Sequence, residues 1–265
     1  MTVSSPRLYM LQTGTNRCQL RNIKLNQGDT SPYEIPIPFY VLMHPKGVAV
    51  LDGGTALEAG RDPHGYWGAA ANIYTPVMKE GEDCVSQVRA LGIAPEDVRW
   101  VVQSHLHIDH TGSVGRFPNA VHIVQRSEYE YAYAPDWFAA AGYSRKDIDR
   151  PGIRWQFLNG VADDMHDVFG DGTLRTVFTP GHSPGHQSFM INLPNSGKIV
   201  LAIDAAYTRD HWEERALPGF MTSATEAVRS VQKLRAIAER DEAVVITGHD
   251  PDEWDGFRKA PAYYD

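Results

Sequence analysis

The chain has 265 residues, of which 42% are hydrophobic and 22% charged, an ordinary balance for a globular protein with a substantial core. Its formal net charge of -8 argues against non-specific binding of nucleic acid, which needs a basic surface, and is compatible with a small neutral or amphiphilic substrate. The two cysteines, Cys18 and Cys84, are too few and too far apart for a disulfide framework or a thiol-based zinc site.

The N-terminus, MTVSSPRLYMLQTG, lacks the basic segment and long apolar run of a signal peptide. No apolar stretch approaches the roughly 18 residues needed to span a bilayer. We therefore expect a cytoplasmic protein with no membrane partner. No linker or repeat divides the chain, so residues 1–265 are expected to form one domain.

The first half of the chain predicts a β-hairpin, a helix and a strand. Two apolar runs, IPFYVLMH and VAVLDGG, flank the turn PKG and predict a β-hairpin whose second strand, VAVL, ends at Asp52. Acidic residues at the start and a glycine at the end mark residues 80–92 as a helix. RWVVQS, residues 99–104, predicts a buried strand that leads directly to His105.

The second half predicts five more strands and two helices. The strands are residues 120–125, 173–179, 187–192, 198–204 and the segment AVVITG before His249, with the helix-like SEYEYAYA after the first of them. Ser223 followed by Glu226 is a capping-box pattern, which opens a helix with an apolar stripe. The segments 60–68 and 135–152 are expected to be large loops. Strands alternating with helices indicate an α/β protein with sheets inside and helices outside.

The stretch SHLHIDH, residues 104–110, is typical of a metal site. In a strand, His105, His107 and Asp109 would point one way and His110 the other. If all four converge, the strand must end near Ser104 and a loop must follow. Loops at strand ends commonly carry the active-site groups of layered α/β proteins, and His and Asp are ligands that zinc and related metals prefer.

Three further candidate ligands each follow a predicted strand: His182, Asp204 and His249. With the cluster they make five histidines and two aspartates, more than the four protein ligands that one tetrahedral metal takes. We therefore expect two metals bridged by one carboxylate. Two metals roughly 3.5–4 Å apart suit hydrolysis, because both act on one water and one polarised oxygen.

The HxHxDH pattern with downstream His, Asp and His resembles the metallo-β-lactamase superfamily over about residues 35–250. The resemblance implies a four-layer αββα sandwich. It also implies that His105, His107 and His182 hold one metal, that Asp109, His110 and His249 hold the other, and that Asp204 bridges. Asp52 matches the superfamily's early strand-end aspartate, for which a structural rather than a coordinating role is expected.

Within the superfamily, TPGHSPGHQSFMI, IDAAYT, SHLHIDHTG, IVQRSEYEYA and the terminal GHD resemble N-acyl-homoserine lactonases, the quorum-quenching enzymes. The resemblance implies opening of a lactone ring by a metal-bridging hydroxide. Tyr207 and a metal would stabilise the oxyanion, and Asp109 would carry the proton. The cofactors would be two divalent ions, zinc first, with iron, cobalt or manganese as alternatives. The resemblance is also compatible with a homodimer.

Three alternatives stay open from the sequence. One is hydrolysis of another lactone or ester, such as γ-butyrolactone or pyridoxolactone. A glyoxalase II-like thioesterase fits the ligands, although the chain does not clearly show that family's C-terminal helical region. A non-catalytic sensor of metal or lactone belongs to a different class. His107, where flavodiiron oxidoreductases have Glu, favours hydrolysis over redox chemistry.

Substrate contacts are predicted from aromatic residues. An acyl chain needs an apolar groove, for which Phe39, Trp67 and Trp137 are candidates beside Tyr207. The alternative is that these aromatic side chains only pack large loops. For His186, the second histidine of GHSPGH, we expect a structural role behind the ligands.

Overall fold

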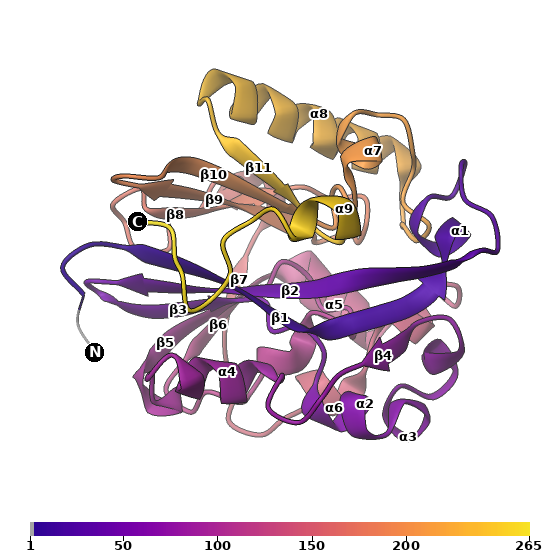
Figure 1. The fold of residues 1–265 in the computed structure, drawn as a ribbon, viewed down its shortest axis with the longest axis horizontal. Helices are drawn as coiled ribbons and strands as arrows, with labels where there is room; N and C mark the ends of the chain where they lie inside the picture. Colours follow the sequence, from indigo (N-terminus) through magenta and orange to yellow (C-terminus); the bar gives the residue numbers. More distant parts are fainter. Residues whose placement is uncertain (1–2) are drawn as a thin grey trace.

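The computed structural model describes residues 3–265 and contains two β-sheets that pack face to face between outer layers of helices (Figure 1). The larger sheet has the strand order β4-β1-β2-β3-β5-β6-β7, and the smaller has the order β11-β10-β9-β8. This architecture confirms the αββα sandwich predicted from the sequence. The strands are β1 (Arg7–Gln19), β2 (Pro32–His44), β3 (Gly47–Leu51), β4 (Thr75–Val77), β5 (Val98–Val102), β6 (Val121–Gln125), β7 (Arg154–Leu158), β8 (Leu174–Phe178), β9 (Gln187–Leu193), β10 (Gly197–Ile203) and β11 (Val244–Thr247).

Helices cover the outer faces of both sheets, with α7 and α8 over the smaller sheet and α2, α3, α4 and α6 over the larger one (Figure 1). The α-helices are α1 (Leu20–Ile23), α2 (Leu57–Arg61), α3 (Pro63–Trp67), α4 (Cys84–Ala90), α5 (Arg126–Tyr133), α6 (Arg145–Ile148), α7 (Arg209–Trp212), α8 (Ala224–Arg240) and α9 (Pro251–Trp254). Short 3-10 helices are η1 (Gly68–Asn72), η2 (Pro95–Asp97), η3 (Thr111–Ser113), η4 (Ala140–Gly142) and η5 (Gly160–Asp163).

The strands of the larger sheet are apolar on both faces because each face packs on a different layer. In β1, Leu8 and Met10 lie in the core between the sheets, whereas Tyr9 and Leu11 lie under α4. This alternation follows from the two-residue repeat of a strand. A sheet covered on both sides loses the polar–apolar alternation that identifies half-exposed strands, and its sequence reads as continuous apolar runs.

Helix α8 begins where its capping residue predicts. The Oγ atom of Ser223 accepts a hydrogen bond from the backbone N–H of Glu226 at 3.3 Å, which satisfies one of the free donors of the first turn. The predicted stripe is buried through Val231, Leu234 and Ile237, which pack on the outer face of the smaller sheet. Burial of this stripe, rather than helix propensity alone, fixes the helix against the sheet.

Several elements differ from the prediction. The predicted helix 80–92 is only Cys84–Ala90, because the Asp83 side chain caps it by accepting from the N–H of Ser86 at 3.0 Å. The segments expected to be large loops contain the short helices α3, η4 and α6. Strands β1, β4 and β7 were not predicted.

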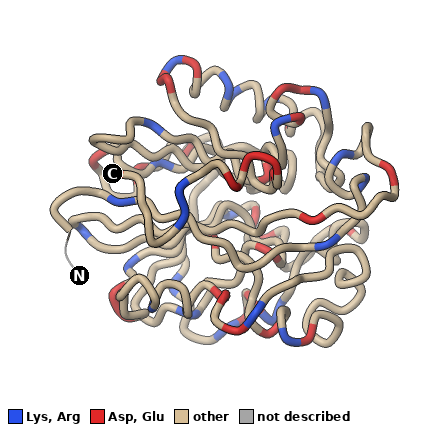
Figure 2. Tube along the Cα trace, in the orientation of Figure 1, with Lys and Arg blue, Asp and Glu red and all other residues tan. Residues whose placement is uncertain are grey.

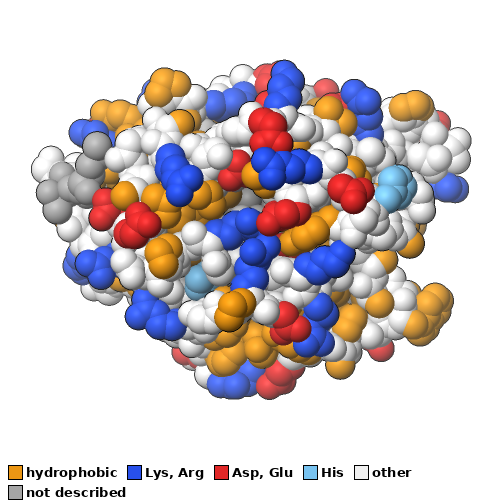
Figure 3. Space-filling model, turned by 90° about the horizontal axis from the view of Figure 1, so that it is seen from below, with side chains coloured by type: hydrophobic (Ala, Val, Ile, Leu, Met, Phe, Trp, Pro, Cys, Tyr) orange, Lys and Arg blue, Asp and Glu red, His pale blue; other side chains and the backbone are white. Residues whose placement is uncertain are grey.

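Charged residues lie mainly on helices and loops around the sheets (Figure 2). On the face drawn in Figure 3, acidic and basic side chains are interspersed. No helix in residues 3–265 is both long enough and apolar enough to cross a membrane.

Candidate metal centre

The SHLHIDH segment is a loop, as the convergence of its side chains requires. Strand β5 ends at Val102, and the chain then turns, with the N–H of His110 donating to the carbonyl of His107 at 3.0 Å. The loop closes on the end of β3, where the N–H of Gly112 donates to the carbonyl of Gly54 at 2.8 Å. A Cβ atom at Gly112 would lie 2.4 Å from the Gly53 carbonyl oxygen, so only glycine fits at this approach.

The other three predicted ligands come from the smaller sheet. His182 follows β8, Asp204 comes directly after β10, and His249 follows β11. Because β8, β10 and β11 run in the same direction and end at the edge that faces the SHLHIDH loop, all seven predicted ligands lie together in two groups. The first group is His105, His107, His182 and Asp204, and the second is Asp109, His110 and His249, with the potential ligand atoms of each group within 4.8 Å of one another.

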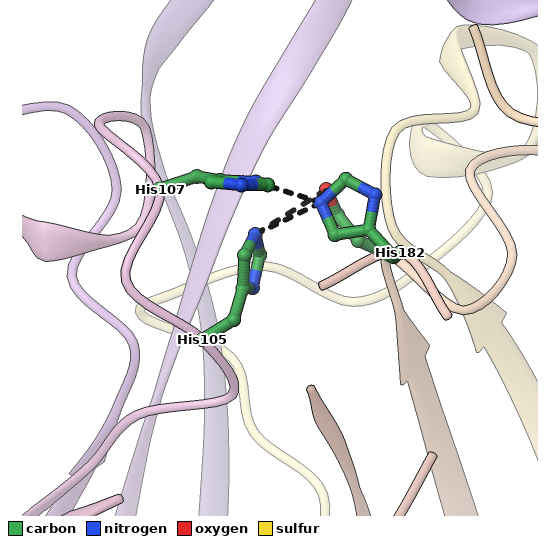
Figure 4. A group of neighbouring side chains, drawn as sticks. His105, His107 and His182 are labelled. Atoms are coloured by element: carbon green, nitrogen blue, oxygen red, sulfur yellow. Dashed lines mark hydrogen bonds and ion pairs between the residues drawn. The ribbon is translucent and has the colours of Figure 1, made fainter. Parts of the chain in front are cut away.

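The rings of the first group point toward one another (Figure 4). The Nε2 atom of His182 lies 2.7 Å from Nδ1 of His107 and 3.2 Å from Nε2 of His105. His105 and His107 come from the loop after β5, and His182 comes from the opposite sheet. Three ring nitrogens therefore meet at one point between the sheets.

The two oxygens of Asp204 face different groups. Its Oδ2 lies 3.2 Å from Nε2 of His182 and 3.7 Å from Nε2 of His105. Its Oδ1 lies 3.1 Å from Nε2 of His249 and 3.4 Å from Nε2 of His110. This is the position that a bridging carboxylate requires.

Asp109 completes the second group from the side of the cavity. Its Oδ1 lies 3.8 Å from Nε2 of His110, and its Oδ2 lies 4.0 Å from Nε2 of His249. The Asp109 side chain is 18% exposed, whereas those of His110, His249 and Asp204 are at most 4% exposed. Asp109 is thus the group of this set that solvent or a substrate reaches.

Hydrogen bonds behind the imidazoles fix which nitrogen faces inward. Nδ1 of His249 donates to the Pro36 carbonyl at 2.9 Å, and Nδ1 of His182 donates to the Phe220 carbonyl at 3.1 Å. A carbonyl only accepts, so in both rings the proton is on Nδ1 and the lone pair is on the inward Nε2.

Asp52 plays the structural role expected of it. Its Oδ2 lies 2.9 Å from Nδ1 of His110 and accepts from the Ser104 hydroxyl at 2.7 Å, and its Oδ1 accepts from the N–H of Ser104 at 2.6 Å. The Ser104 oxygen in turn lies 2.9 Å from Nδ1 of His105. Asp52 therefore orients one imidazole of each group without facing the centre itself.

The first group is held neutral by its surroundings. Burial, together with the neighbouring imidazoles, lowers the pKa of His105 and of His107 well below the ordinary value. Burial likewise lowers the pKa of His182 to about 3. Neutral imidazole is the form of histidine that binds metals.

The second group attracts positive charge. Burial would lower the pKa of His110 and His249, but the carboxylates of Asp204 and Asp109 outweigh it and raise both. Burial in turn would raise the pKa of Asp204, yet the surrounding imidazoles lower it well below its usual range. A cation at this place, whether protons or a metal, is therefore stabilised by both carboxylates.

The donor set fits two metals. Within residues 3–265, Nε2 of His110 and Oδ1 of Asp204 are buried and make no hydrogen bond, although they lie only 3.4 Å apart. Buried polar atoms normally find partners, and atoms that converge without bonding one another are typical of ligands to an ion. Imidazole and carboxylate donors suit zinc and other divalent transition metals.

Glu128 was missed by the sequence analysis. This carboxylate on α5 is fully buried and accepts from the N–H of Leu106 at 3.0 Å, between the ligands His105 and His107. It also accepts from the Ser183 hydroxyl at 2.6 Å and the N–H of Gly185 at 3.0 Å, in the loop that follows His182. One side chain thus ties together the two loops that supply the first group.

His186 also lies behind the ligands, as expected. Its Nδ1 lies 2.9 Å from the Thr179 hydroxyl and 3.1 Å from the Thr179 carbonyl oxygen, and its Nε2 accepts from the N–H of Asp204 at 3.2 Å. Because the backbone N–H of Asp204 donates to this ring, His186 positions Asp204, and its Nε2 is not free to bind a metal.

A cavity of about 700 Å³ opens onto the two groups. Its floor includes His107, Asp109, Asp204, His182 and His249. Its remaining walls are largely apolar and consist of Asn16, Ile23, Ile35, Ala70, Ile73, Tyr74, Ile108, Phe138, Ala141, Gly142, Tyr207 and Phe220.

The structure corrects the predicted aromatic groove. Tyr207 lines the cavity, but Phe39 lies in the core under α4, on the sheet face that alternation assigns to it. Trp67 packs behind the cavity with Ala70 and Ile108. Trp137 is 90% exposed, and its neighbour Phe138 lines the cavity instead. Phe39 and Trp67 therefore pack within the protein and do not line the groove, which is the alternative that the sequence left open.

Comparison with known proteins decides the family. The model of the metallo-beta-lactamase superfamily matches residues 34–249. The chain belongs to the metallo-beta-lactamase superfamily. Within this superfamily it is 64% identical over 259 residues to the N-acyl homoserine lactonase AttM of Azorhizobium caulinodans, with 98% of each chain covered.

More distant superfamily members agree. An N-acyl homoserine lactonase of Bacillus cereus is 31% identical over 267 residues, which cover 99% of this chain and 100% of that one. A solved N-acyl homoserine lactone hydrolase with N-hexanoyl-L-homoserine bound at its catalytic metal centre superposes with a TM-score of 0.88 at 27% identity, with both chains fully covered. The recognition of the lactonase branch from sequence motifs is therefore confirmed, and membership of the family implies divalent metals at the His/Asp cluster.

Proposed function

We propose that this protein is a dinuclear metal-dependent hydrolase that opens the lactone ring of N-acyl-homoserine lactones. The observation that carries the proposal is the bridging position of Asp204, with one oxygen toward each ligand group, on the floor of a largely apolar cavity. The high identity to proteins named N-acyl homoserine lactonase supports the same reaction.

Two metals would be held by the two groups that the side chains form. His105, His107 and His182 would hold one, Asp109, His110 and His249 the other, and Asp204 would bridge them. We propose zinc, with iron, cobalt or manganese as alternatives of similar ligand preference. When bound, such a pair lowers the pKa of a water to about 7 and polarises the ester carbonyl.

Tyr207 is the proposed donor to the carbonyl oxygen of the lactone. Its hydroxyl lies 3.2 Å from Nδ1 of His182 and 3.4 Å from the Phe220 carbonyl, on the wall of the cavity. Nδ1 of His182 carries its own proton, so the hydroxyl hydrogen of Tyr207 is held only by the long contact to Phe220. It is free to turn to the oxyanion that forms when water adds to the ester carbon.

Asp109 is the proposed proton carrier. Water that adds to the carbonyl carbon loses a proton, and the ring oxygen gains one when its bond to that carbon breaks. The Asp109 carboxylate is the most exposed member of the ligand set and lines the cavity, so its oxygens can accept the first proton and deliver the second. The products are the open hydroxy acid with its acyl chain intact.

The cavity suits an amphiphilic substrate. It combines the polar candidate ligands with largely apolar walls, the combination that a polar ring with an apolar chain requires. Ile23, Ile35, Ile73 and Phe138 would contact an acyl chain, while the ring ester rests near Tyr207.

The decisive experiment is a ring-opening assay of the metal-loaded protein on acyl-homoserine lactones of several chain lengths, beside γ-butyrolactone and a thioester. We expect turnover of the acyl lactones. Fast turnover of the thioester alone would indicate a glyoxalase II-like enzyme, and turnover of γ-butyrolactone alone would indicate a different lactonase. Metal binding without any turnover would indicate a sensor.

A further inference from the structure

Asn16 is a buried polar side chain without a partner in the wall of the cavity. It is 1% exposed, and neither Oδ1 nor Nδ2 has a hydrogen-bond partner within residues 3–265. Among the described cavity-lining residues, the others with an unpartnered buried atom are His107, at Nε2, and Asp204, at Oδ1, and both residues belong to the candidate ligand groups. Asn16 belongs to neither ligand group, so metal binding does not explain why its side chain lacks a hydrogen-bond partner.

The strand pairing directs Asn16 toward the cavity. In β1, Asn16 lies directly opposite Ile35 of β2, and directly opposed residues project from the same face of a sheet. Ile35 lines the cavity and packs with Tyr207. Cys18, two residues along β1 and on the same face, packs in the same cluster. The Asn16 carboxamide is thus surrounded by apolar side chains on the Tyr207 side of the cavity.

A buried carboxamide in an apolar wall is costly unless something hydrogen-bonds it. An apolar residue of similar size at position 16 would avoid the loss. A site that places one polar group in an otherwise apolar wall uses it to orient a ligand that carries a matching group.

We propose that Asn16 recognises the amide that links the acyl chain to the lactone ring. This inference rests on the proposed function and names the part of the substrate to which the protein hydrogen-bonds. The proposed substrate has, besides the ring ester, a single amide with one donor and one acceptor, followed by an apolar chain. The Asn16 side chain offers one acceptor and two donors among apolar neighbours. An amide two bonds from the ester carbonyl, which rests near Tyr207, reaches the Asn16 side of the cavity while the chain follows Ile35 and Ile23.

Specificity for the amide follows from this contact. A lactone with a plain alkyl chain at the same ring carbon would leave the Asn16 carboxamide unpaired, and it would therefore bind less well. Sites built to hydrogen-bond a substrate group discriminate strongly against analogues that lack it.

The test compares Asn16→Leu with the unaltered enzyme on two matched substrates. One is an N-acyl-homoserine lactone, and the other is an α-alkyl-γ-butyrolactone with a chain of equal length and no amide. We expect the ratio of kcat/KM for the acyl over the alkyl lactone to fall about tenfold in Asn16→Leu, mainly through KM. Because the variant also removes an unpaired buried group, we expect its midpoint of thermal unfolding to rise by about 2–4 °C.

Asn192→Leu is the matched control, because it makes the same substitution at an exposed position of β9 outside the cavity lining. The ratio should stay as in the unaltered enzyme. An unchanged ratio in Asn16→Leu would overturn the assignment, as would an equal loss on both substrates with a lower unfolding midpoint, which would mark Asn16 as structural. If the unaltered enzyme opens neither lactone, the proposed function itself is wrong. That outcome differs from the two results that would overturn the role of Asn16 alone.

Discussion

His110 is a member of one ligand group only, because Asp52 holds its Nδ1 and its Nε2 faces the second group. We therefore expect His110→Ala to lower the metal content from about two to about one per chain. Elemental analysis of protein purified with excess zinc measures this directly. His64→Ala, at an exposed position outside both groups, is the control and should keep both metals. A content of one metal in the unaltered protein would contradict the dinuclear proposal.

Tyr207 contacts the ligand His182 but belongs to neither ligand group. Tyr207→Phe removes only the hydroxyl, so we expect kcat to fall by about 10²-fold, the usual effect of losing one oxyanion donor, with two metals retained. Steady-state kinetics and metal analysis on the same preparation check both parts. Unchanged kcat would remove Tyr207 from the reaction, and loss of metal would make its role structural.

The candidate ligands, which the structure brings together, could be predicted from sequence because their signal is local. Each one follows an apolar strand, and glycines beside His182 and His249 permit the turns that expose them. Asn16 and Glu128 had no such signal. The donors to Glu128 come from residues 15, 22, 55 and 57 positions away, and Asn16 is recognisable only because, among the described residues, its side chain in the cavity wall has no hydrogen-bond partner. Such roles depend on tertiary contacts that a single sequence does not reveal.

Helix α5 connects the two ligand loops through Glu128. In Glu128→Gln, one oxygen is replaced by an NH₂ group, which cannot accept from the Ser183 hydroxyl or the N–H of Gly185. The buried donors left unpaired should cost about 1–3 kcal/mol of unfolding free energy. Because the loop after His182 loses its anchor, we expect metal affinity to fall by about 10-fold or more in competition with a chelator.

Glu130→Gln, on the same helix at an exposed position, is the matched control. It should leave both the unfolding free energy and the metal affinity unchanged. Equal metal affinity in Glu128→Gln and Glu130→Gln would show that Glu128 serves the fold alone.

Element prediction succeeded where apolar runs were short and bounded, as in β6, β9 and β10. It failed at β1, whose segment RLYMLQTGTNRCQ mixes apolar residues with Gln, Thr and Asn. The positions of two of these polar residues are explained by their neighbours in the fold. The Gln12 side chain accepts a hydrogen bond from the indole N–H of Trp254 at 2.5 Å, and Asn16 lines the cavity. Strand β7 (RWQFL) does alternate charged or polar with apolar residues, but the run is only five residues long and follows a Gly/Pro-rich segment expected to be a loop; its parallel pairing with β6 places it at the end of the larger sheet.

At the scale of the whole molecule, the candidate metal ligands come from both sheets. Four come from the loop after β5 of the larger sheet, and three from the ends of β8, β10 and β11 of the smaller one. Metals held by this ligand set would therefore link the two sheets, and their binding would stabilise the folded state by mass action. We expect a chelator to lower the midpoint of thermal unfolding by roughly 5–10 °C, and added zinc to restore it.

Scanning calorimetry with and without the chelator measures this shift. The same chelator saturated with zinc beforehand is the control for its direct effects on the protein. An unchanged midpoint after verified metal removal would show that the sheets are held together by their apolar core alone.

The proposed bridging role of Asp204 has a thermodynamic consequence beyond holding two ions. A single negative charge shared by two cation sites makes their occupancies interdependent: an ion at one site changes the field and the orientation of the oxygen that the other site uses. By linkage, whatever the first ion does to the affinity for the second, the second does equally to the first. A binding titration of this protein should therefore be described by one coupling free energy carried by Asp204, and not by two independent dissociation constants.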